Sequence, residues 1–500
     1  MTAAQRPTLA SLPARYDLIV IGGGITGAGI LHEAARTGAS VLLVEQNDFA
    51  SGTSCASSKL VHGGLRYLKD KQWRLTLESV RERNRLLRDR AGLVERQPFL
   101  MPVYRGARPG RGAMRIGLAI YDLMGGSWHS RSLSAQQALA LEPGLRSEGL
   151  AGAVAYDDAQ TDDARLVLRL IFEAQAAGAR ALNYVRVNEV LKAADGRVRG
   201  VALRDMVNGD SREIEAGLVI NAAGAWSAAL PGDPGGAPIL RPLRGSHLIF
   251  PLDKLPVGRA VSWLHVRDRR PVFVYPWQGV ALYGTTDLDH GDADPGRPGM
   301  SAEEARYLME GLAHQFPQLG LKLEDAICCY SGVRPIVSSG KDDPSAESRE
   351  SASWQSPGWI GITGGKLTTF RVTACEVLGL AAKQLPRLAP RAEAVQAQAQ
   401  PTSRLAARYG AEGAAWLEQS AAADREAIPG TPYLWGELRW AARSEAVVHL
   451  ADLLLPKGGA GLLDRVAAIC REELHWDETR LAMERSRYLD LWRRQHAVAP

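Results

Sequence analysis

A glycine-rich turn near the N-terminus has the residue pattern that binds a phosphate-containing cofactor. Gly22, Gly24 and Gly27 match G-x-G-x-x-G, directly follow the apolar run 16–21, which predicts a buried strand, and open a predicted helix. The first glycine permits a tight turn, the second lets backbone N–H groups approach a pyrophosphate, and the third lets the helix pack closely on the strand. The sequence therefore predicts a dinucleotide site here.

An acidic residue at the end of the next predicted strand supports this site. Glu45 closes the apolar run 40–45 and lies about twenty residues beyond the turn, where an acid accepts hydrogen bonds from an adenosine ribose. A glycine turn with a purely structural role would lack an acid at this spacing. Glutamate rather than arginine at this position also argues against a 2′-phosphate on the ribose.

Two segments far along the chain favour FAD over NAD. The apolar run 216–224 predicts a third buried strand that ends at Ala223 and Gly224, and Gly364 and Gly365 precede a helix predicted to begin near Lys366. A nicotinamide enzyme usually builds one contiguous domain, whereas a longer cofactor requires such interleaved segments. A helix N-terminus at the flavin would stabilise the anionic reduced ring; the alternative is an ordinary glycine loop before an amphipathic helix.

Seven motifs follow one another along the chain in the order found in a known family. They occupy residues 21–29, 53–67, 162–166, 244–247, 283–287, 330–335 and 364–369. Together they resemble the FAD-dependent glycerol-3-phosphate dehydrogenases, over residues 16–384. The stretches 57–67 and 330–335 are specific to this family rather than general to flavoproteins.

That resemblance implies an α/β fold of the D-amino-acid-oxidase type. It consists of a Rossmann-like FAD-binding domain interleaved with a substrate domain built on an antiparallel sheet, followed by a C-terminal α-helical domain. We expect a leader at 1–15, FAD-binding segments at 16–80, 150–230 and 345–390, substrate-domain segments at 81–149 and 231–344, and the helical domain at 400–500.

The resemblance also implies a reaction, namely oxidation of sn-glycerol 3-phosphate to dihydroxyacetone phosphate by hydride transfer to non-covalent FAD. Electrons are then expected to pass to a membrane quinone. One alternative is an alpha-glycerophosphate oxidase of the same fold that reduces O2 to H2O2, and another is an FAD-holding protein without turnover. We expect a cytoplasmic protein, or one attached peripherally to the cytoplasmic face of the membrane, with no nucleic-acid partner; a homodimer stays open.

The matched motifs imply a set of cofactor contacts. These are Gly22, Gly24, Gly27, Glu45, Ser57, Ser58, Lys59, His62, Gly63, Gly64, Ala223, Gly224, Gly365, Lys366, Leu367 and Thr368. The segment 56–64 is expected to wrap the flavin. His62 could suggest a covalent flavin link, but we interpret it as a histidine packed by a non-covalent cofactor.

The same motifs imply a substrate site for a phosphate ester. Its residues are Arg66, Tyr67, His247, Arg334, Arg349 and Lys366, of which His247, Arg334 and Lys366 are expected to be catalytic. A phosphomonoester is mostly dianionic and matches several guanidinium groups, whereas an amino-acid oxidase needs chiefly one cation. We prefer His247 as the base for the hydroxyl proton, because imidazole titrates at about pH 6.5. His247 could instead only hydrogen-bond the ligand, with Arg334 or a water accepting the proton.

Composition excludes several other classes of protein. The chain has 500 residues, of which 46% are hydrophobic and 23% charged, so a peptide-sized, disordered or disulfide-stapled protein is excluded. A net charge of +5 is too small for a nucleic-acid footprint. Five scattered cysteines without a C-x-x-C pair predict free thiols in a reducing compartment and no metal site. No apolar run reaches the roughly 18 residues that span a bilayer.

Further predicted elements surround these sites. The stretch 73–126 is expected to be helical and basic, with ten arginines between 81 and 115, and it could attach to anionic lipid beside the apolar run 116–121 or be a solvated helix face. A half-buried antiparallel sheet is predicted over 241–330, with a turn at Gln278 and Gly279. A helix is predicted from Gly364 to about Gln384, and the last hundred residues are expected to be helical.

Overall fold

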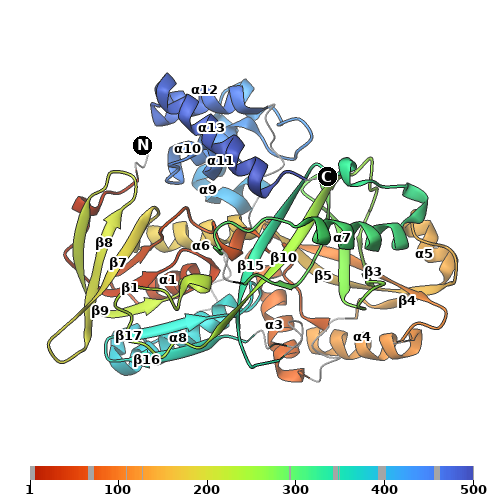
Figure 1. The fold of residues 1–500 in the computed structure, drawn as a ribbon, viewed down its shortest axis with the longest axis horizontal. Helices are drawn as coiled ribbons and strands as arrows, with labels where there is room; N and C mark the ends of the chain where they lie inside the picture. The colour runs from red at the N-terminus through yellow and green to blue at the C-terminus, as the bar shows by residue number, and fades with distance from the viewer. Residues whose placement is uncertain are drawn as a thin grey trace.

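A computed structural model describes residues 6–65, 72–108, 110–126, 128–291, 294–341, 347, 350–391, 401, 403–454 and 462–498. Two β-sheets lie next to each other with helices packed around them (Figure 1). The helices near the C-terminus form a third group, drawn in blue at the top of the view (Figure 1). This arrangement is the α/β fold with a C-terminal helical part that the motifs imply.

The first sheet contains the predicted strand before the glycine turn. Its strand order is β16 (Ala352–Ser356), β17 (Trp359–Thr363), β9 (Ser211–Asn221), β1 (Arg15–Ile21), β2 (Val41–Val44) and β6 (Arg180–Leu182), with the hairpin of β7 (Val185–Lys192) and β8 (Val198–Asp205) joined to β9. The strands from β17 to β6 pair in parallel. A parallel sheet that is covered on both faces needs apolar residues throughout, which explains the uninterrupted apolar runs.

Helices cover one face of this sheet, and the β7–β8 hairpin packs against the other. Leu18 and Val20 of β1 pack with α1 (Ile25–Ala35), α6 (Asp163–Ala176) and α8 (Phe370–Gln384). Ile19 and Ile21 pack instead with apolar residues of β7 and β8. The alternation along β1 therefore fixes which side of the strand each residue faces.

The second sheet is mostly antiparallel, as predicted for the region 241–330. Its order is β14 (Leu288–Asp289), β10 (Leu240–Pro251), β13 (Val280–Gly284), β12 (Pro271–Trp277), β11 (Ala260–Leu264), β3 (Val94–Tyr104), β5 (Leu150–Thr161) and β4 (Arg131–Leu133), with β15 (Cys328–Val337) paired to β10. The turn at Gln278 and Gly279 joins β12 to β13 as predicted. Apolar residues of α7 (Ala302–Gln315) pack on one face, and those of α3 (Trp73–Asp89) and α4 (Arg111–Gly125) pack on the other.

The structure corrects three sequence-based expectations. The stretch 73–126 is not continuously helical, because Val94–Tyr104 forms β3 and pairs with β5 over its whole length. Strand β5 itself lies in the second sheet, although the boundary at 150 gave it to the FAD-binding segments. Helix α8, which packs on the first sheet, begins at Phe370 rather than near Lys366, because the turn that starts at Gly364 and Gly365, both with positive φ angles, continues to the N-cap residue Thr369.

The C-terminal part is helical, as predicted. It contains α9 (Arg404–Gln419), α10 (Trp435–Ser444), α11 (Leu450–Leu453), α12 (Leu463–Leu474) and α13 (Glu478–Gln495). After α13 the chain meets the free edge of β15, where the Cys329 N–H donates to His496 O at 3.0 Å. Within the described residues, no helix combines the length and apolar character needed to cross a bilayer.

Candidate active site

The glycine turn leaves no room for side chains at two positions. A Cβ on Gly22, whose φ is +109°, would lie 2.5 Å from the carbonyl oxygen of Ala222, and a Cβ on Gly27 would overlap the carbonyl oxygen of Gly22. Helix α1 begins at Ile25, whose N–H donates to Ser54 Oγ at 2.9 Å, and its first turn has no acid. The helix N-terminus thus presents backbone donors and partial positive charge, which fit a pyrophosphate.

Glu45 lies directly after β2, next to this turn. Its Oε2 accepts from the Gly23 N–H at 2.7 Å and its Oε1 accepts from the Asn47 N–H at 2.8 Å. Burial raises the pKa of Glu45, whereas these backbone donors act in the opposite direction. Each carboxylate oxygen can accept a second hydrogen bond, so the geometry is compatible with the predicted ribose contact.

Three of the predicted cofactor segments meet at the carboxyl ends of β1, β9 and β17. The Thr363 hydroxyl donates to Gly224 O at 3.3 Å, and the Thr368 hydroxyl donates to His62 O at 3.3 Å. These bonds bring the segment after β9 and the segment around His62 to the Gly364–Gly365 turn. Ligands bind at this edge of parallel sheets, and the structure thus gathers residues that are far apart in the sequence.

Asp163 holds the segment 55–64, which we call the wrapping loop, against α6. Its Oδ2 accepts from the backbone N–H and the hydroxyl of Ser57, at 3.1 and 2.6 Å, and its Oδ1 accepts from Lys59 Nζ at 2.7 Å. Burial alone would lower the pKa of Lys59, but Asp163 and Asp162 keep it above its ordinary value. The Lys59 ammonium is thus bound to Asp163 inside the protein. Only the backbone of Lys59 is left for the predicted cofactor contact.

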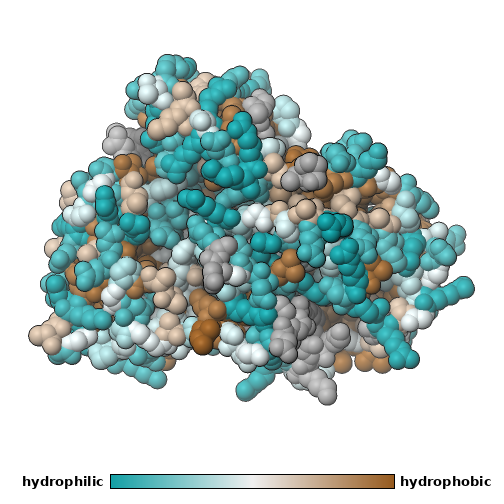
Figure 2. Space-filling model, viewed as in Figure 1, coloured by the Kyte–Doolittle hydropathy of each residue, from teal (hydrophilic) through white to brown (hydrophobic). Residues whose placement is uncertain are grey.

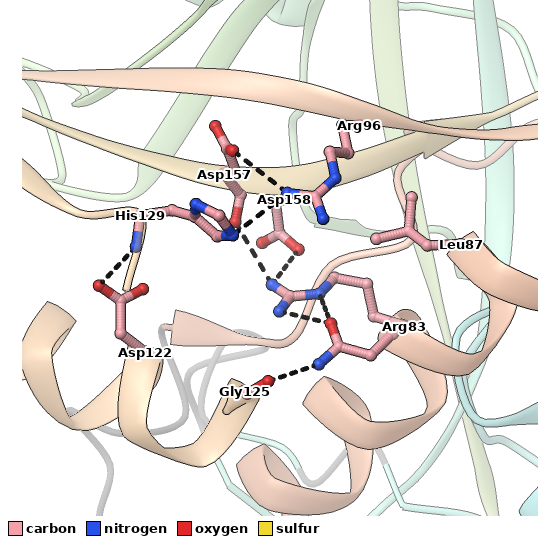
Figure 3. Close-up of a pocket in the computed structure, with 9 residues that line it drawn as sticks. Arg83, Leu87, Arg96, Asp122, Gly125, His129, Asp157 and Asp158 are labelled. Atoms are coloured by element: carbon pink, nitrogen blue, oxygen red, sulfur yellow. Dashed lines mark hydrogen bonds and ion pairs between the residues drawn. The ribbon is translucent and has the colours of Figure 1, made fainter. Parts of the chain in front are cut away.

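A second buried carboxylate, Asp158, supports the other end of the wrapping loop. It accepts from the Gly63 N–H at 3.0 Å, the Tyr121 hydroxyl at 3.0 Å and Arg83 Nη1 at 3.1 Å. Arg83 and Asp158 line a cavity of about 30 Å³, together with Arg96, His129 and Asp157 (Figure 3). This volume holds about one water molecule, which is too little for a phosphate ester. The contacts of Asp158 that line the cavity support the loop.

His247 lies on β10 beneath the wrapping loop and is 1% exposed. Its Nε2 is 2.9 Å from Ser58 Oγ, and its ring stacks on Tyr330 with centroids 4.7 Å apart. Nδ1 has no hydrogen-bond partner among the described residues. Burial, Arg334 and Lys59 hold the pKa of His247 well below its ordinary value, so the ring is neutral at pH 7.

Arg334 lies on β15, on the same face of the second sheet as His247. The register pairs Tyr330 with His247, and Arg334 follows four residues along the strand, which places both side chains on one face. Arg334 Nη1 donates to Asp287 Oδ1 at 2.6 Å, and Asp287 also pairs with Arg270 at 3.2 Å. One carboxylate between two guanidinium groups leaves a net positive charge, which suits a bound anion.

Of the remaining predicted substrate residues, one is described by the structure and three are not. Lys366 lies in the turn before α8, near Glu78 of α3. Burial raises the pKa of Glu78, and the positive charge of Lys366 opposes that rise. No hydrogen bond between Lys366 and His247 is found among the described residues. Arg66, Tyr67 and Arg349 lie outside the described residues.

Comparison with known proteins places this site in a family. A model of the FAD-dependent oxidoreductases matches residues 17–371, which contain both sheets and the glycine turn. The chain belongs to the family of FAD-dependent oxidoreductases. Residues 378–481 match a second model, the C-terminal domain of alpha-glycerophosphate oxidase. The cofactor of this oxidoreductase is FAD. The backbone donors of the glycine turn and the carboxylate of Glu45 have a geometry compatible with its pyrophosphate and ribose.

Individual relatives agree with this assignment. The oxidoreductase is 37% identical to an aerobic glycerol-3-phosphate dehydrogenase of Staphylococcus haemolyticus over 376 residues, which cover 74% of this chain and 67% of the relative. A crystal structure of the glycerol-3-phosphate dehydrogenase from Bacillus halodurans complexed with FAD is similar with a TM-score of 0.75 and 27% identity, and covers 97% of this chain and 96% of that one. An L-alpha-glycerophosphate oxidase from Mycoplasma pneumoniae shares the fold, with a TM-score of 0.58 and 19% identity over 73% of this chain and 94% of that one.

Sequence reasoning did not assign roles to several acids in the site. Asp163 and Asp287 lie within the matched stretches 162–166 and 283–287, so their presence in those motifs was the available signal. Asp158 lies outside the seven motifs and has no such signal. Its partner Arg83 belongs to the basic stretch, where nothing in the sequence separates a buried arginine from exposed ones.

Proposed function

We propose that this oxidoreductase converts sn-glycerol 3-phosphate to dihydroxyacetone phosphate. The observation that supports the proposal is the position of His247 and Arg334 on one face of neighbouring strands, because a neutral imidazole and a guanidinium on the same face are what this reaction needs. The relative of 37% identity and the similar structure with FAD are both named as glycerol-3-phosphate dehydrogenases, which supports this substrate.

The chain's own residues would divide the work as follows. Arg334, oriented by Asp287, binds the phosphate with charge-assisted hydrogen bonds, and Arg66, Arg349 and Lys366 are proposed to complete the cationic pocket. His247 takes the proton of the substrate hydroxyl, while Ser58 fixes the orientation of its ring through Nε2. When bound, FAD supplies the acceptor of the substrate hydride.

The test is a flavin spectrum recorded without oxygen. Adding glycerol 3-phosphate should bleach the flavin of the holoenzyme, and Arg334→Ala should raise KM about 10- to 100-fold, because a charge-assisted hydrogen bond is lost. Arg259→Ala is the matched control, because Arg259 is similarly exposed and pairs with Glu142 at 3.3 Å near the same sheet. A flavin that keeps its colour with this substrate would exclude the proposed activity and leave an FAD-holding protein without this turnover.

The electron acceptor is proposed to be a quinone, with O2 as the alternative. The similarity to proteins named dehydrogenases favours the quinone, whereas the C-terminal match to an oxidase domain favours O2. Anaerobic turnover with a soluble quinone analogue, measured beside peroxide formation in air, distinguishes the two. Fast peroxide formation with no quinone reduction would identify an oxidase.

A quinone acceptor requires contact with lipid, and we propose that α4 provides it. Arg83 and Arg90 of the basic stretch pair with Asp158 and Glu173 inside the protein, and Arg85 pairs with Asp89 one turn along the same helix. Arg105, Arg108, Arg111 and Arg115 are exposed.

Between these arginines and Trp128, the outward residues of α4 are apolar, with Ile116 66% and Leu123 69% exposed. Figure 2 shows apolar side chains at the lower right margin, where Figure 1 places α4. Exposed apolar residues beside arginines are typical of a helix lying on anionic lipid.

Charge on this face should release the protein from membranes. The double variant Ile116→Glu, Leu123→Glu is expected to lower binding to vesicles containing anionic lipid at least about tenfold, because each glutamate is repelled by the surface and cannot enter the apolar layer. Sedimentation with vesicles measures this. The control is Ile239→Glu, since Ile239 is 80% exposed elsewhere on the molecule. Equal vesicle binding by both variants would exclude α4 as the contact.

A further inference from the structure

Two adjacent carboxylates at the start of α6 contact two different parts of the protein. Asp163 binds Ser57 and Lys59 of the wrapping loop. Asp162, the N-cap of α6, accepts from Arg408 Nη2 of α9 at 2.7 Å through its Oδ2. The wrapping loop and the C-terminal helices therefore meet at one pair of neighbouring residues.

These four charged side chains are buried next to one another, and Arg408 also lies 3.7 Å from Glu437. Lys59 and Arg408 are 6% and 5% exposed, and Asp162 and Asp163 are buried as well. Arg408, Lys59 and, to a smaller extent, Arg165 together outweigh the effect of burial on Asp162 and lower its pKa, so Arg408 and Lys59 act on the same carboxylate. A buried charge that loses its partner is strongly unfavourable, and Asp162 without Arg408 would compete with Asp163 for Lys59.

The position of Lys59 in turn bears on His247. Ser58 lies between the two residues that Asp163 binds, and its hydroxyl contacts His247 Nε2 at 2.9 Å. The backbone of this stretch is fixed from the second sheet, since the Tyr330 hydroxyl donates to Ser57 O at 2.9 Å and the Tyr275 hydroxyl donates to Ser58 O at 2.5 Å. A shift of this backbone that follows Lys59 toward Asp162 would have to break these two hydrogen bonds and would move Ser58 away from His247.

We infer that Arg408 is a positioning residue: by neutralising Asp162, the docked C-terminal helices leave Asp163 free to hold the wrapping loop against FAD and Ser58 against His247. The inference rests on the proposed cofactor contacts of the wrapping loop and, for its effect on turnover, on the proposed function. It gives the C-terminal helical part a role in the site although none of its residues is proposed to touch substrate or cofactor.

The chain offers a matched control for this inference. Arg165 of α6 forms a bidentate ion pair with Glu445 at the end of α10, with distances of 2.5 and 2.9 Å. This pair also joins α6 to the C-terminal helices and is also buried, yet within the described residues neither side chain hydrogen-bonds to the wrapping loop. Glu445→Gln therefore weakens the same docking and leaves the Arg408–Asp162 pair in place.

The test compares Arg408→Met, Arg408→Lys and Glu445→Gln. Arg408→Met should raise the Kd of the apoprotein for FAD about tenfold, shift the visible spectrum of the bound flavin, and lower kcat while KM for glycerol 3-phosphate stays the same. Arg408→Lys, which keeps the charge, should restore most of the FAD affinity. Glu445→Gln should lower Tm to a similar extent and leave FAD affinity within about twofold of the parent.

Two results would overturn the inference: unchanged FAD affinity and spectrum in Arg408→Met, or equal loss of FAD affinity in Glu445→Gln. If Arg408→Met does not fold, Arg408→Gln takes its place with the same expectations, because it also removes the charge that neutralises Asp162. Asp162→Asn should instead keep FAD affinity near that of the parent, because it removes the carboxylate that would compete for Lys59. FAD affinity and spectrum are measured without substrate, so these results stand even if glycerol 3-phosphate does not bleach the flavin.

Discussion

His247→Ala is expected to lower kcat by about 10²–10⁴-fold, which is the range for loss of a general base. The reason is structural: the ring is stacked on Tyr330, oriented by Ser58 and neutral at pH 7, so removing it leaves no comparable acceptor on this strand. Steady-state turnover with glycerol 3-phosphate and a quinone analogue measures the effect. FAD should remain bound, and the flavin spectrum checks this.

The pH dependence gives this prediction a second readout. Because the pKa of His247 is lowered, the base is deprotonated above that value, and kcat/KM should fall only when the pH drops well below about 6.5. This acid limb should disappear in His247→Ala. A variant with normal turnover and an unchanged pH profile would show that His247 only hydrogen-bonds the ligand.

A second buried histidine in the same sheet provides a control that separates loss of catalysis from loss of stability. His265 follows β11, is 1% exposed and stacks on Tyr307 with centroids 3.7 Å apart, while its Nε2 lies 2.8 Å from Tyr307 O. His265→Ala removes a ring of the same size and burial from the face of the second sheet that α7 covers. It should cost stability and leave kcat near that of the parent enzyme.

The parts of the site that were predictable from the sequence are those built by local chain geometry. The strand, the glycine turn and Glu45 lie within one βαβ unit, where spacing alone fixes their relation. The hairpin at Gln278 and Gly279 was predictable for the same reason, because a turn signal separates two apolar runs. Strand β3 was missed because its partner, β5, begins far along the chain and the basic residues around it favoured a helix.

Contacts across the chain were beyond sequence reasoning for a physical reason. Ser58 meets His247, and Lys59 meets Asp163, only because the two sheets bring remote segments together, and no residue pattern encodes that approach. The resemblance named Lys59 as a cofactor contact, whereas its side chain forms a buried ion pair. Arg83 was grouped with surface arginines, although Asp158 holds it inside the protein.

Gly27→Ala is expected to abolish FAD binding at ordinary cofactor concentrations. In an open helix position this change would stabilise the protein, because alanine is the better helix former by about 1 kcal/mol. Here the added methyl group would overlap the carbonyl oxygen of Gly22, and neither strand β1 nor α1 can yield without moving the turn that receives the pyrophosphate. Overpacking of this kind costs about 1–3 kcal/mol, and the displaced backbone donors lose the phosphate as well.

A glycine with open space shows whether the effect is specific. Gly379 lies inside α8, and a Cβ there would meet nothing within 4 Å. Gly379→Ala should therefore keep the yellow cofactor and raise Tm slightly, whereas Gly27→Ala should purify colourless and fail to recover absorbance when FAD is added. Retention of flavin by Gly27→Ala at the parent affinity would mean that helix α1 does not approach the pyrophosphate, and the cofactor would then have to lie away from the glycine turn.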